Sequence, residues 1–164
     1  MLGLGSNVGD RLGRLREATA RVAALDGVRL VACSSVYETE PVGEVPDQRD
    51  FFNAAVCVET DLEPLDLLAA CKSIERELGR TAGPRHGPRA IDVDLLLVDD
   101  FVLESDRLRL PHPELRSRRF VLVPVLELQP ALRLPDGTSL QDCLTSLPPG
   151  QRVSRVGSLE PVAG

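Results

Sequence analysis

The order of secondary-structure signals along this chain predicts an α+β sandwich, in which helices cover a mainly antiparallel central sheet. Apolar residues alternate with polar ones in several short segments and recur at helical spacing in others. These segments follow one another in the order strand, helix, strand, strand, helix, strand. The chain has 164 residues, of which 43% are hydrophobic and 27% are charged, so one domain can bury a substantial core.

In the first half of the chain we expect a strand, a helix and two further strands. The first strand covers residues 1–5, and the turn residues after it, which include Asp10, can cap a helix. Apolar residues at helical spacing indicate that helix, and Gly27 ends it. Segments rich in β-branched and aromatic residues then predict the strands Val28–Tyr37 and Phe51–Thr60.

In the second half, a helix opens at Pro64 and ends at Gly79, and a glycine- and proline-rich loop follows it. The later expectations are a strand at 91–97 with a hairpin partner at 101–104, and helices at 118–128 and 140–147. This order corresponds to a ferredoxin-like topology with additions after the fourth strand. We expect residues 1–147 to form a single domain and residues 148–164 to form a Pro/Gly-rich tail with partial disorder.

The overall charge argues against a nucleic acid or an anionic membrane as the main partner. The net charge is −6, whereas both interactions depend on excess positive charge. Positive charge is concentrated locally, because residues 80–119 contain eight arginines against seven acids. No apolar run approaches the length of a membrane span. We therefore expect small-molecule substrates. A monomer is a separate expectation.

The four cysteines, Cys33, Cys57, Cys71 and Cys143, are scattered and do not form a zinc-binding pattern. The sequence also lacks a signal peptide, so the thiols fit a reducing cytoplasm. We interpret them as small core residues.

Asp92 and Asp94 are two carboxylates within an otherwise apolar segment. If the segment is a strand with one face in the core, both carboxylates share the opposite face, roughly 6 to 7 Å apart. Two acids side by side gain little on a solvent-exposed strand, so a cation is expected between them. Two oxygen donors on a rigid element suit Mg²⁺, which fills its remaining positions with water and substrate phosphates.

Arg80, Arg85 and Arg89 lie in the loop just before these acids. Guanidinium groups beside a metal site suit phosphoryl transfer, because its transition state is stabilised mainly by positioned positive charge. Arginines that merely pair with the two acids, beside a solvated loop, are the simpler alternative for an isolated Asp-x-Asp pair.

Aromatic residues are scarce, with no Trp, one Tyr and four Phe. Phe51 and Phe52 precede Asn53 on a predicted strand, and Phe120 opens a late helix. Core packing explains at least one of Phe51 and Phe52. A flat heteroaromatic substrate would, however, require two aromatic faces and an amide with a donor and an acceptor side by side.

The glycines of Gly3-Leu4-Gly5-Ser6-Asn7-Val8-Gly9 approximate a dinucleotide-binding fingerprint, but the third glycine is one position late. The predicted strand pair before Pro64 also interrupts the alternation that a Rossmann fold needs, so we reject that interpretation.

Several further motifs accompany the Asp-x-Asp pair. They are Leu4-Gly5-Ser6-Asn7, Tyr37-Glu38-Thr39, Phe52-Asn53-Ala54-Ala55-Val56, Ile74-Glu75, Gly79-Arg80, the run from Arg85 to Leu95, Leu110-Pro111-His112-Pro113 and Arg118-Arg119-Phe120-Val121-Leu122. Together they resemble the 6-hydroxymethyl-7,8-dihydropterin pyrophosphokinase family of folate biosynthesis, from Leu2 to roughly Leu147. The Gly-Pro-Arg-x-x-Asp-x-Asp segment is highly specific to that family.

The resemblance implies an enzyme that moves the pyrophosphoryl group of ATP onto the hydroxymethyl oxygen of the pterin and releases AMP, with mobile loops over the active site. Asp92 and Asp94 would hold two Mg²⁺ ions, and Arg80 and Arg89 match arginines that act on the phosphates. Around the nucleotide, the matching positions are His112 and Arg118 in contact with ATP, and Glu75, Leu95, Arg107 and Arg109 close to it.

For the pterin, the resemblance implies a stacked pocket. Phe51 and Phe120 would sandwich the ring, and Asn53 would read its pyrimidine edge. The pocket would be completed by main-chain groups of Thr39, Glu40 and Val42.

The chain departs from the family pattern in the arginine loop. His86 stands where members often carry Trp, and Ala82 or Gly83 stands where a further arginine can occur. Because this loop closes over ATP in the family, we expect weaker ATP binding or slower chemistry. A non-catalytic ligand-binding module and a Mg²⁺-dependent phosphoesterase are the alternative functions.

Overall fold

The computed structural model describes residues 1–43, 45–81, 83 and 86–160. The chain folds into eight strands and four helices in these residues. In chain order they are β1 (Leu2–Ser6), α1 (Arg11–Ala23), β2 (Val28–Cys33), β3 (Ser35–Thr39), β4 (Phe51–Thr60), α2 (Pro64–Glu77), β5 (Asp92–Leu95), β6 (Leu103–Glu104), β7 (Arg109–Leu110), α3 (Arg119–Leu128), α4 (Leu140–Ser146) and β8 (Val153–Ser158).

The central sheet has the strand order β5-β1-β4-β3-β8, and β2 also pairs with β4. All of its pairings are antiparallel. Since β2 and β3 together occupy the second strand position, β1 through β5 reproduce the predicted ferredoxin-like arrangement. The predicted fold class, an α+β sandwich with helices flanking a mainly antiparallel sheet, is confirmed.

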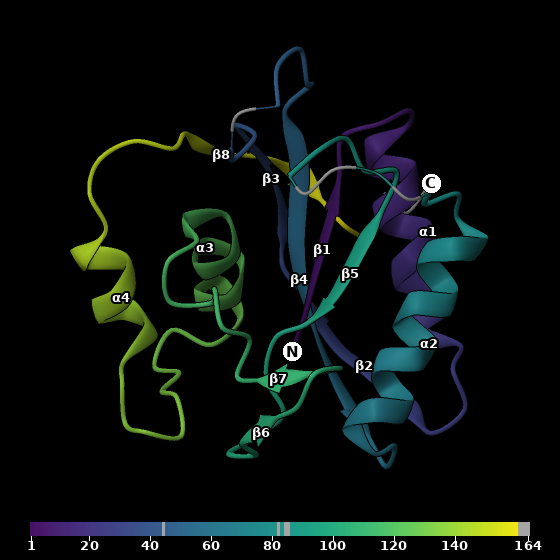
Figure 1. Cartoon of the computed structure of the whole chain (residues 1–164), viewed down its shortest axis with the longest axis vertical. Helices are drawn as coiled ribbons and strands as arrows, with labels where there is room; N and C mark the ends of the chain where they lie inside the picture. Colours follow the sequence, from purple (N-terminus) through teal and green to yellow (C-terminus); the bar gives the residue numbers. More distant parts are fainter. Residues whose placement is uncertain (44, 82, 84–85, 161–164) are drawn as a thin grey trace.

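Helices cover both faces of this sheet (Figure 1). The helices α1 and α2 pack against β1, β4 and β5 on one face, whereas α3 packs against β3 and β4 on the other and carries α4 on its outer side. Leu15, Val22 and Leu67 are buried beneath the first helix pair, and Leu122 and Leu140 beneath the second. Burial of each such side chain contributes about 1.5–3 kcal/mol, so the sheet is held rigidly from both sides.

The ends of the two long helices follow the predicted signals. The Asp10 carboxylate caps α1 by accepting the Gly13 N–H at 2.9 Å. Gly27 ends the connection after α1 with φ +78°, and Gly79 follows α2 with φ +96°, a conformation that favours glycine. Pro64 opens α2 at its first turn. These elements match the sequence-based expectations closely.

Three expectations about strands were wrong. The predicted strand Val28–Tyr37 is two strands, because Ser34 interrupts it: the Ser34 hydroxyl accepts the Ala55 N–H at 2.8 Å and donates to the Ser35 carbonyl. The segment at 101–104 does not pair with the Asp-x-Asp strand; β6 pairs with β7, and β5 pairs with β1. The tail predicted at 148–164 contains β8, which pairs with β3.

Two further observations concern membranes and thiols. No helix in the described residues combines the length and apolar character that a membrane crossing requires. All four cysteines are free thiols, and Cys71 is fully buried in the core.

A carboxylate near the end of α3 fixes this helix on the sheet. Glu127 accepts the Ser35 N–H at 2.9 Å, the Ser35 hydroxyl at 2.7 Å and the Tyr37 hydroxyl at 2.7 Å. Partial burial alone would raise the pKa of Glu127, but the hydrogen bonds from Ser35 and Tyr37 outweigh it, so the pKa lies below its ordinary value. Glu127 therefore links α3 to β3 most strongly when it is ionised.

Glu127→Ala is expected to lower the free energy of unfolding by about 1 kcal/mol at pH 7, since the hydrogen bonds are partly exposed to solvent. Because the pKa is lower in the folded state, this contribution is present above the unfolded pKa and is lost as pH falls through the folded pKa. The difference between the two proteins should therefore shrink below about pH 4 in urea unfolding curves. Glu59→Ala, which removes an exposed partner of Arg29, is the control. Equal effects of both substitutions at pH 7 would contradict the prediction.

Candidate active site

The floor of the site is a row of residues across three neighbouring strands. In the sheet register, Asp92 of β5 lies beside Gly5 of β1, and Gly5 lies beside Asn53 of β4. Gly3 stands between Asp94 and Ala55 in the same way. Because both glycines lack side chains, the sheet face is left open between the carboxylates and the Asn53 amide. The glycine run therefore shapes a hollow rather than a dinucleotide loop.

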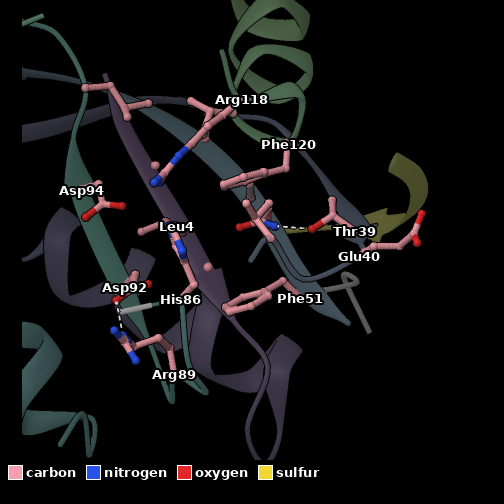
Figure 2. Close-up of a pocket in the computed structure, with 18 of the residues that line it drawn as sticks. Leu4, Thr39, Glu40, Phe51, His86, Arg89, Asp92, Asp94, Arg118 and Phe120 are labelled. Carbon is pink, nitrogen blue, oxygen red and sulfur yellow. Dashed lines mark hydrogen bonds and ion pairs between the residues drawn. The ribbon is translucent and has the colours of Figure 1, made fainter. Parts of the chain in front are cut away.

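That hollow is a cavity of about 210 Å³, which we call the aromatic pocket. Phe51 of β4 and Phe120 of α3 lie on two sides of it, and Asp92 and Asp94 lie across from them (Figure 2). The remaining lining residues are Gly3, Leu4, Gly5, Thr39, Glu40, Val42, Asn53, Ala54, Ala55, Arg80, His86, Gly87, Arg89, Leu96, Arg118 and Val121. Two aromatic faces with a polar floor suit a flat, hydrogen-bonding ligand.

Asn53 is held in one orientation at the floor of the aromatic pocket. Its side chain is buried, and its amide nitrogen donates to the Thr39 hydroxyl at 2.6 Å (Figure 2). This bond consumes one of the two amide donors and directs the carbonyl oxygen toward Gly5, where a Cβ atom would lie only 2.7 Å from it. Gly5 is therefore required for the present position of the Asn53 amide.

A second hollow of about 400 Å³, the basic groove, adjoins the first. Its lining residues are Leu68, Lys72, Asp94, Leu95, Ser105, Asp106, Arg107, Leu108, Arg109, His112 and Pro113. Positive side chains outnumber negative ones here, which suits a polyanion. Asp94 lines both hollows, so a molecule in each would meet at this carboxylate.

His112 is set up as a neutral hydrogen-bond donor. Burial lowers the pKa of His112, although nearby Asp94 acts in the opposite direction. Its Nδ1 atom accepts the Glu114 N–H at 3.1 Å, which assigns the ring proton to Nε2. His112 can therefore offer an N–H group to an oxygen in the basic groove.

Asp92 is electrostatically disfavoured as an anion. Burial, together with the charge of Asp94, raises the pKa of Asp92 to about 6, even though Arg80 and Arg89 act to lower it. The Arg80 Nε atom lies 3.2 Å and the Arg89 Nε atom 3.8 Å from Asp92 Oδ1. The predicted alternation is confirmed, since Val93 and Leu95 are buried while Asp92 and Asp94 face the pocket. In the part of the chain that the structure describes, the arginine pairs go to Asp92 and none goes to Asp94.

This pair of carboxylates fits a hard divalent cation. The donors are oxygen atoms on adjacent outward positions of a rigid strand, and burial, together with the charge of Asp94, raises the pKa of Asp92. In the described residues, no cluster of three or more His, Cys, Asp or Glu side chains could hold a metal by itself. A protein site with only two carboxylates suits Mg²⁺ that shares its coordination with substrate phosphates.

A buried carboxylate supports the strand that carries these acids. Glu75 of α2 is 2% exposed, and it accepts the Val93 N–H, between the two aspartates, at 2.9 Å. It also accepts from Arg80 at 2.8 Å and from Lys72 at 3.2 Å. Glu75 thus orients both the strand that carries Asp92 and Asp94 and the first of the predicted catalytic arginines.

Asn7 and Gln48 join the loops around Arg89, a role that the sequence did not indicate. Asn7 is buried; its side-chain oxygen accepts the Arg89 N–H at 2.8 Å, and its side-chain nitrogen donates to Gln48 at 3.1 Å and to the Arg49 carbonyl at 3.0 Å. Gln48 donates in turn to the His86 carbonyl at 2.8 Å. The only available signal was the presence of Asn7 in the Leu4-Gly5-Ser6-Asn7 motif.

The predicted site residues divide between the two hollows. The aromatic pocket is lined by all six predicted pterin-binding residues and by Arg80, Arg89, Asp92 and Asp94. The basic groove is lined by four of the predicted nucleotide-binding residues, Leu95, Arg107, Arg109 and His112. Arg118 lines the aromatic pocket instead, and Glu75 lines neither hollow. Arg85 and Ala82 lie outside the described residues.

Carboxylates and arginines at the boundary of two ligand-sized hollows suit the transfer of a charged phosphoryl group between two bound molecules. The fold and the site therefore define a phosphotransferase. The family model described as 7,8-dihydro-6-hydroxymethylpterin-pyrophosphokinase (HPPK) matches residues 1–130, and the chain belongs to this family.

Relatives support the same assignment over most of the chain. The chain is 45% identical over 148 residues to the 2-amino-4-hydroxy-6-hydroxymethyldihydropteridine pyrophosphokinase of Methylorubrum extorquens. The aligned region covers 90% of this chain and 92% of the relative. The chain is 41% identical over 145 residues to the enzyme of the same name from Pseudomonas aeruginosa, with 88% and 89% covered. The family resemblance seen in the sequence is therefore confirmed.

The fold has a close counterpart in a solved structure of an HPPK-DHPS protein in complex with substrates. The TM-score is 0.69 at 13% sequence identity, and the match covers 88% of this chain. This chain spans 42% of the solved chain, less than half of its length. At this identity the similarity concerns the fold alone.

Proposed function

We propose that this chain transfers the pyrophosphoryl group of ATP to the hydroxymethyl oxygen of 6-hydroxymethyl-7,8-dihydropterin, yielding the pterin diphosphate and AMP. The observation that carries the proposal is the position of Asp94 in the lining of both hollows. A pterin in the aromatic pocket and ATP in the basic groove would bring acceptor and donor together beside the two carboxylates. Membership in the pyrophosphokinase family supports the same assignment.

The aromatic pocket offers the chemistry that a pterin ring needs. Phe51 and Phe120 provide flat faces for stacking, and the Asn53 amide provides a donor and an acceptor for the pyrimidine edge. Main-chain groups of Thr39, Glu40 and Val42 would complete the hydrogen bonding. Because Thr39 already fixes the Asn53 amide, little ordering of this side chain is required on binding.

On the nucleotide side, the proposed contacts are Leu95, Arg107, Arg109 and His112 in the basic groove, with Arg118 at the neighbouring pocket. The neutral His112 would donate its Nε2 proton to a phosphate or ribose oxygen. Arg80 and Arg89 lie beside the carboxylates, where charge on the transferred group increases during the reaction. Glu75 holds Arg80 in place for this role.

Asp92 and Asp94 would hold Mg²⁺, and we propose two ions. When bound, Mg²⁺ supplies charge neutralisation at the phosphates and helps to activate the acceptor hydroxyl. The protein contributes the spacing of the two carboxylates along β5 and the arginines beside Asp92.

The test is a product assay with the purified chain, ATP, Mg²⁺ and 6-hydroxymethyl-7,8-dihydropterin, in which nucleotides are separated by chromatography. We expect AMP to form only when the pterin is present. An Asp94→Asn protein purified in the same way controls for contaminating kinases. ADP, or phosphate released without the pterin, would indicate a different phosphotransferase or a phosphoesterase, and absence of products would favour a ligand-binding module.

Gly5→Ala is expected to raise the KM for the pterin about tenfold, which corresponds to about 1.4 kcal/mol of binding free energy. The new Cβ atom would lie 2.7 Å from Asn53 Oδ1 and would force the amide away from its bond to Thr39. Gly3→Ala is the matched control, because its Cβ atom would meet only the flexible Leu96 side chain at 3.3 Å. Equal KM values for the two variants in steady-state kinetics would contradict the prediction.

The remaining aspects of the proposal concern organisation and partners. We propose that residues 1–147 form the catalytic domain and that residues 148–164 follow it as a C-terminal segment, whose strand β8 joins the same sheet. We also propose that the chain is a monomer and acts on small molecules. The net charge of −6 argues against nucleic acid as a partner.

A further inference from the structure

The C-terminal segment reaches the aromatic pocket from outside the part of the chain that the family model matches. That match ends at residue 130, whereas β8 covers Val153–Ser158 and adds an edge strand to the sheet beside β3. At the start of β8, Val153 pairs with Thr39, the residue that orients the Asn53 amide. Segment 150–159, as we name residues 150 to 159, is therefore adjacent to a wall of the pocket.

Gln151 and Arg152 bind the chain just beyond Thr39. The Gln151 side chain donates to the Glu40 carbonyl at 2.6 Å, and the Arg152 N–H donates to the Glu40 carboxylate at 2.7 Å. The Glu40 N–H donates to the Arg152 carbonyl at 3.4 Å. As a result, the Glu40 carboxylate points away from the pocket (Figure 2), although Glu40 is one of the residues that line it.

Arg152 also binds Asp50, at the other end of the connection between β3 and β4. Its guanidinium pairs with the Asp50 carboxylate at 2.5 Å, and Asp50 directly precedes Phe51, one of the two aromatic walls. The Asp50 carbonyl in turn accepts the Arg11 guanidinium at 2.9 Å. One residue of segment 150–159 thus contacts both ends of a loop whose ends flank the pocket.

The far end of the segment is anchored in the core. Leu159 is 2% exposed, and its carbonyl accepts the Arg16 guanidinium at 3.3 Å. The Ser158 carbonyl accepts the same guanidinium at 3.2 Å. The contacts of Arg152 are therefore made from a strand that is fixed at both ends, which allows them to restrain the loop.

We propose that segment 150–159 is a positioning element of the pterin pocket in this chain, with Gln151 and Arg152 as the positioning residues. The pair Thr39–Phe51 ends the β3–β4 ladder. By holding Glu40 and Asp50, the residues just beyond this pair, the segment fixes the main chain that leads to Val42 of the pocket lining before the pterin binds. The inference rests on the proposed function, since it concerns the affinity of the same pocket. Its effect falls on pterin binding and not on the basic groove, which segment 150–159 does not line.

The test compares steady-state kinetics of the full-length chain with those of a Gln151→Ala/Arg152→Ala variant, which leaves the Leu159 anchor intact. We expect the KM for the pterin to rise about fivefold, as an exposed ion pair with a hydrogen bond permits, while the KM for ATP and kcat stay within about twofold. Arg29→Ala is the matched control, because Arg29 forms an exposed ion pair of the same length, 2.5 Å, with Glu59 and does not line the aromatic pocket. Arg152→Lys, which can keep the ion pair with Asp50, should restore part of the affinity.

A chain that ends at Pro149 is a second variant and should show a larger rise, of about tenfold or more, with its melting temperature measured in parallel. An unchanged pterin KM in the Gln151→Ala/Arg152→Ala variant, with AMP still formed, would overturn the inference and leave the proposed function standing. Equal increases in the KM for pterin and ATP would overturn it as well, because they would indicate a general structural role. Absence of pterin-dependent AMP from the unmodified chain would instead refute the proposed function, and the inference with it.

Discussion

Asp92→Asn and Asp94→Asn are each expected to reduce kcat by about 100-fold to 1,000-fold, the range seen when one electrostatic group of a transition-state site is removed. Both carboxylates line the pocket on adjacent outward positions of β5, and Asn is a weaker ligand for Mg²⁺ than a carboxylate. Steady-state rates at saturating Mg²⁺, ATP and pterin would measure the loss. The larger loss is expected at Asp94, since this residue lines both hollows.

Neither substitution should destabilise the fold. Because burial and Asp94 raise the pKa of Asp92 to about 6, the folded state disfavours the charged form relative to the unfolded chain. The resulting penalty is absent below the unfolded pKa and is present in full once pH exceeds the folded pKa, so a neutral Asn avoids it at pH 8. Thermal unfolding at pH 8 with EDTA should therefore place Asp92→Asn at or above the unmodified protein. A lower melting temperature of Asp92→Asn together with unchanged kcat would mean that Asp92 only pairs with Arg80 and Arg89.

Much of the fold could be predicted because its signals are local. Helical spacing and a following glycine define α1 and α2, with a cap at Asp10 for α1 and Pro64 in the first turn of α2. Residues of high β-propensity indicate β4, and alternation defines β5. Ser34 was not predictable as a break, since its hydrogen bonds go to Ala55, which lies on another strand. The strand β8 was missed for a related reason. Five of its six residues are exposed, so it forms by hydrogen bonding to β3 and has no apolar alternation of its own.

The candidate site was predictable in its residue types and less so in its layout. The alternation of Asp92 and Asp94 required only the strand period. The positions of Arg118 in the aromatic pocket and of Glu75 in the core depend on how α3 and α2 dock on the sheet. Asn7 and Gln48 are 41 positions apart, and no local pattern indicates that their side chains meet.

Glu75→Ala is expected to lower the free energy of unfolding by about 2–3 kcal/mol, because a buried N–H loses its acceptor and two partly exposed cations lose a carboxylate partner. The substitution would leave the Val93 N–H without its acceptor in the core and would remove a carboxylate partner from Arg80 and Lys72. For a chain of this length, such a change should lower the melting temperature by about 10 °C. The loss should be visible without any nucleotide, because all the partners of Glu75 belong to the protein.

Glu77→Ala is the matched control for this prediction. Glu77 lies on the same helix and pairs with Arg21, but its side chain is 53% exposed, so its removal should change stability by no more than about 0.5 kcal/mol. Glu75→Gln should fall between the two, since the amide oxygen can still accept the Val93 N–H but the charge opposite Arg80 is lost. The family resemblance implies instead that Glu75 lies close to ATP. If Glu75→Ala and Glu77→Ala have the same melting temperature without nucleotide and Glu75→Ala loses only ATP affinity, Glu75 acts on the nucleotide. If the melting temperature of Glu75→Ala is lower, Glu75 acts by holding β5 and Arg80 in position.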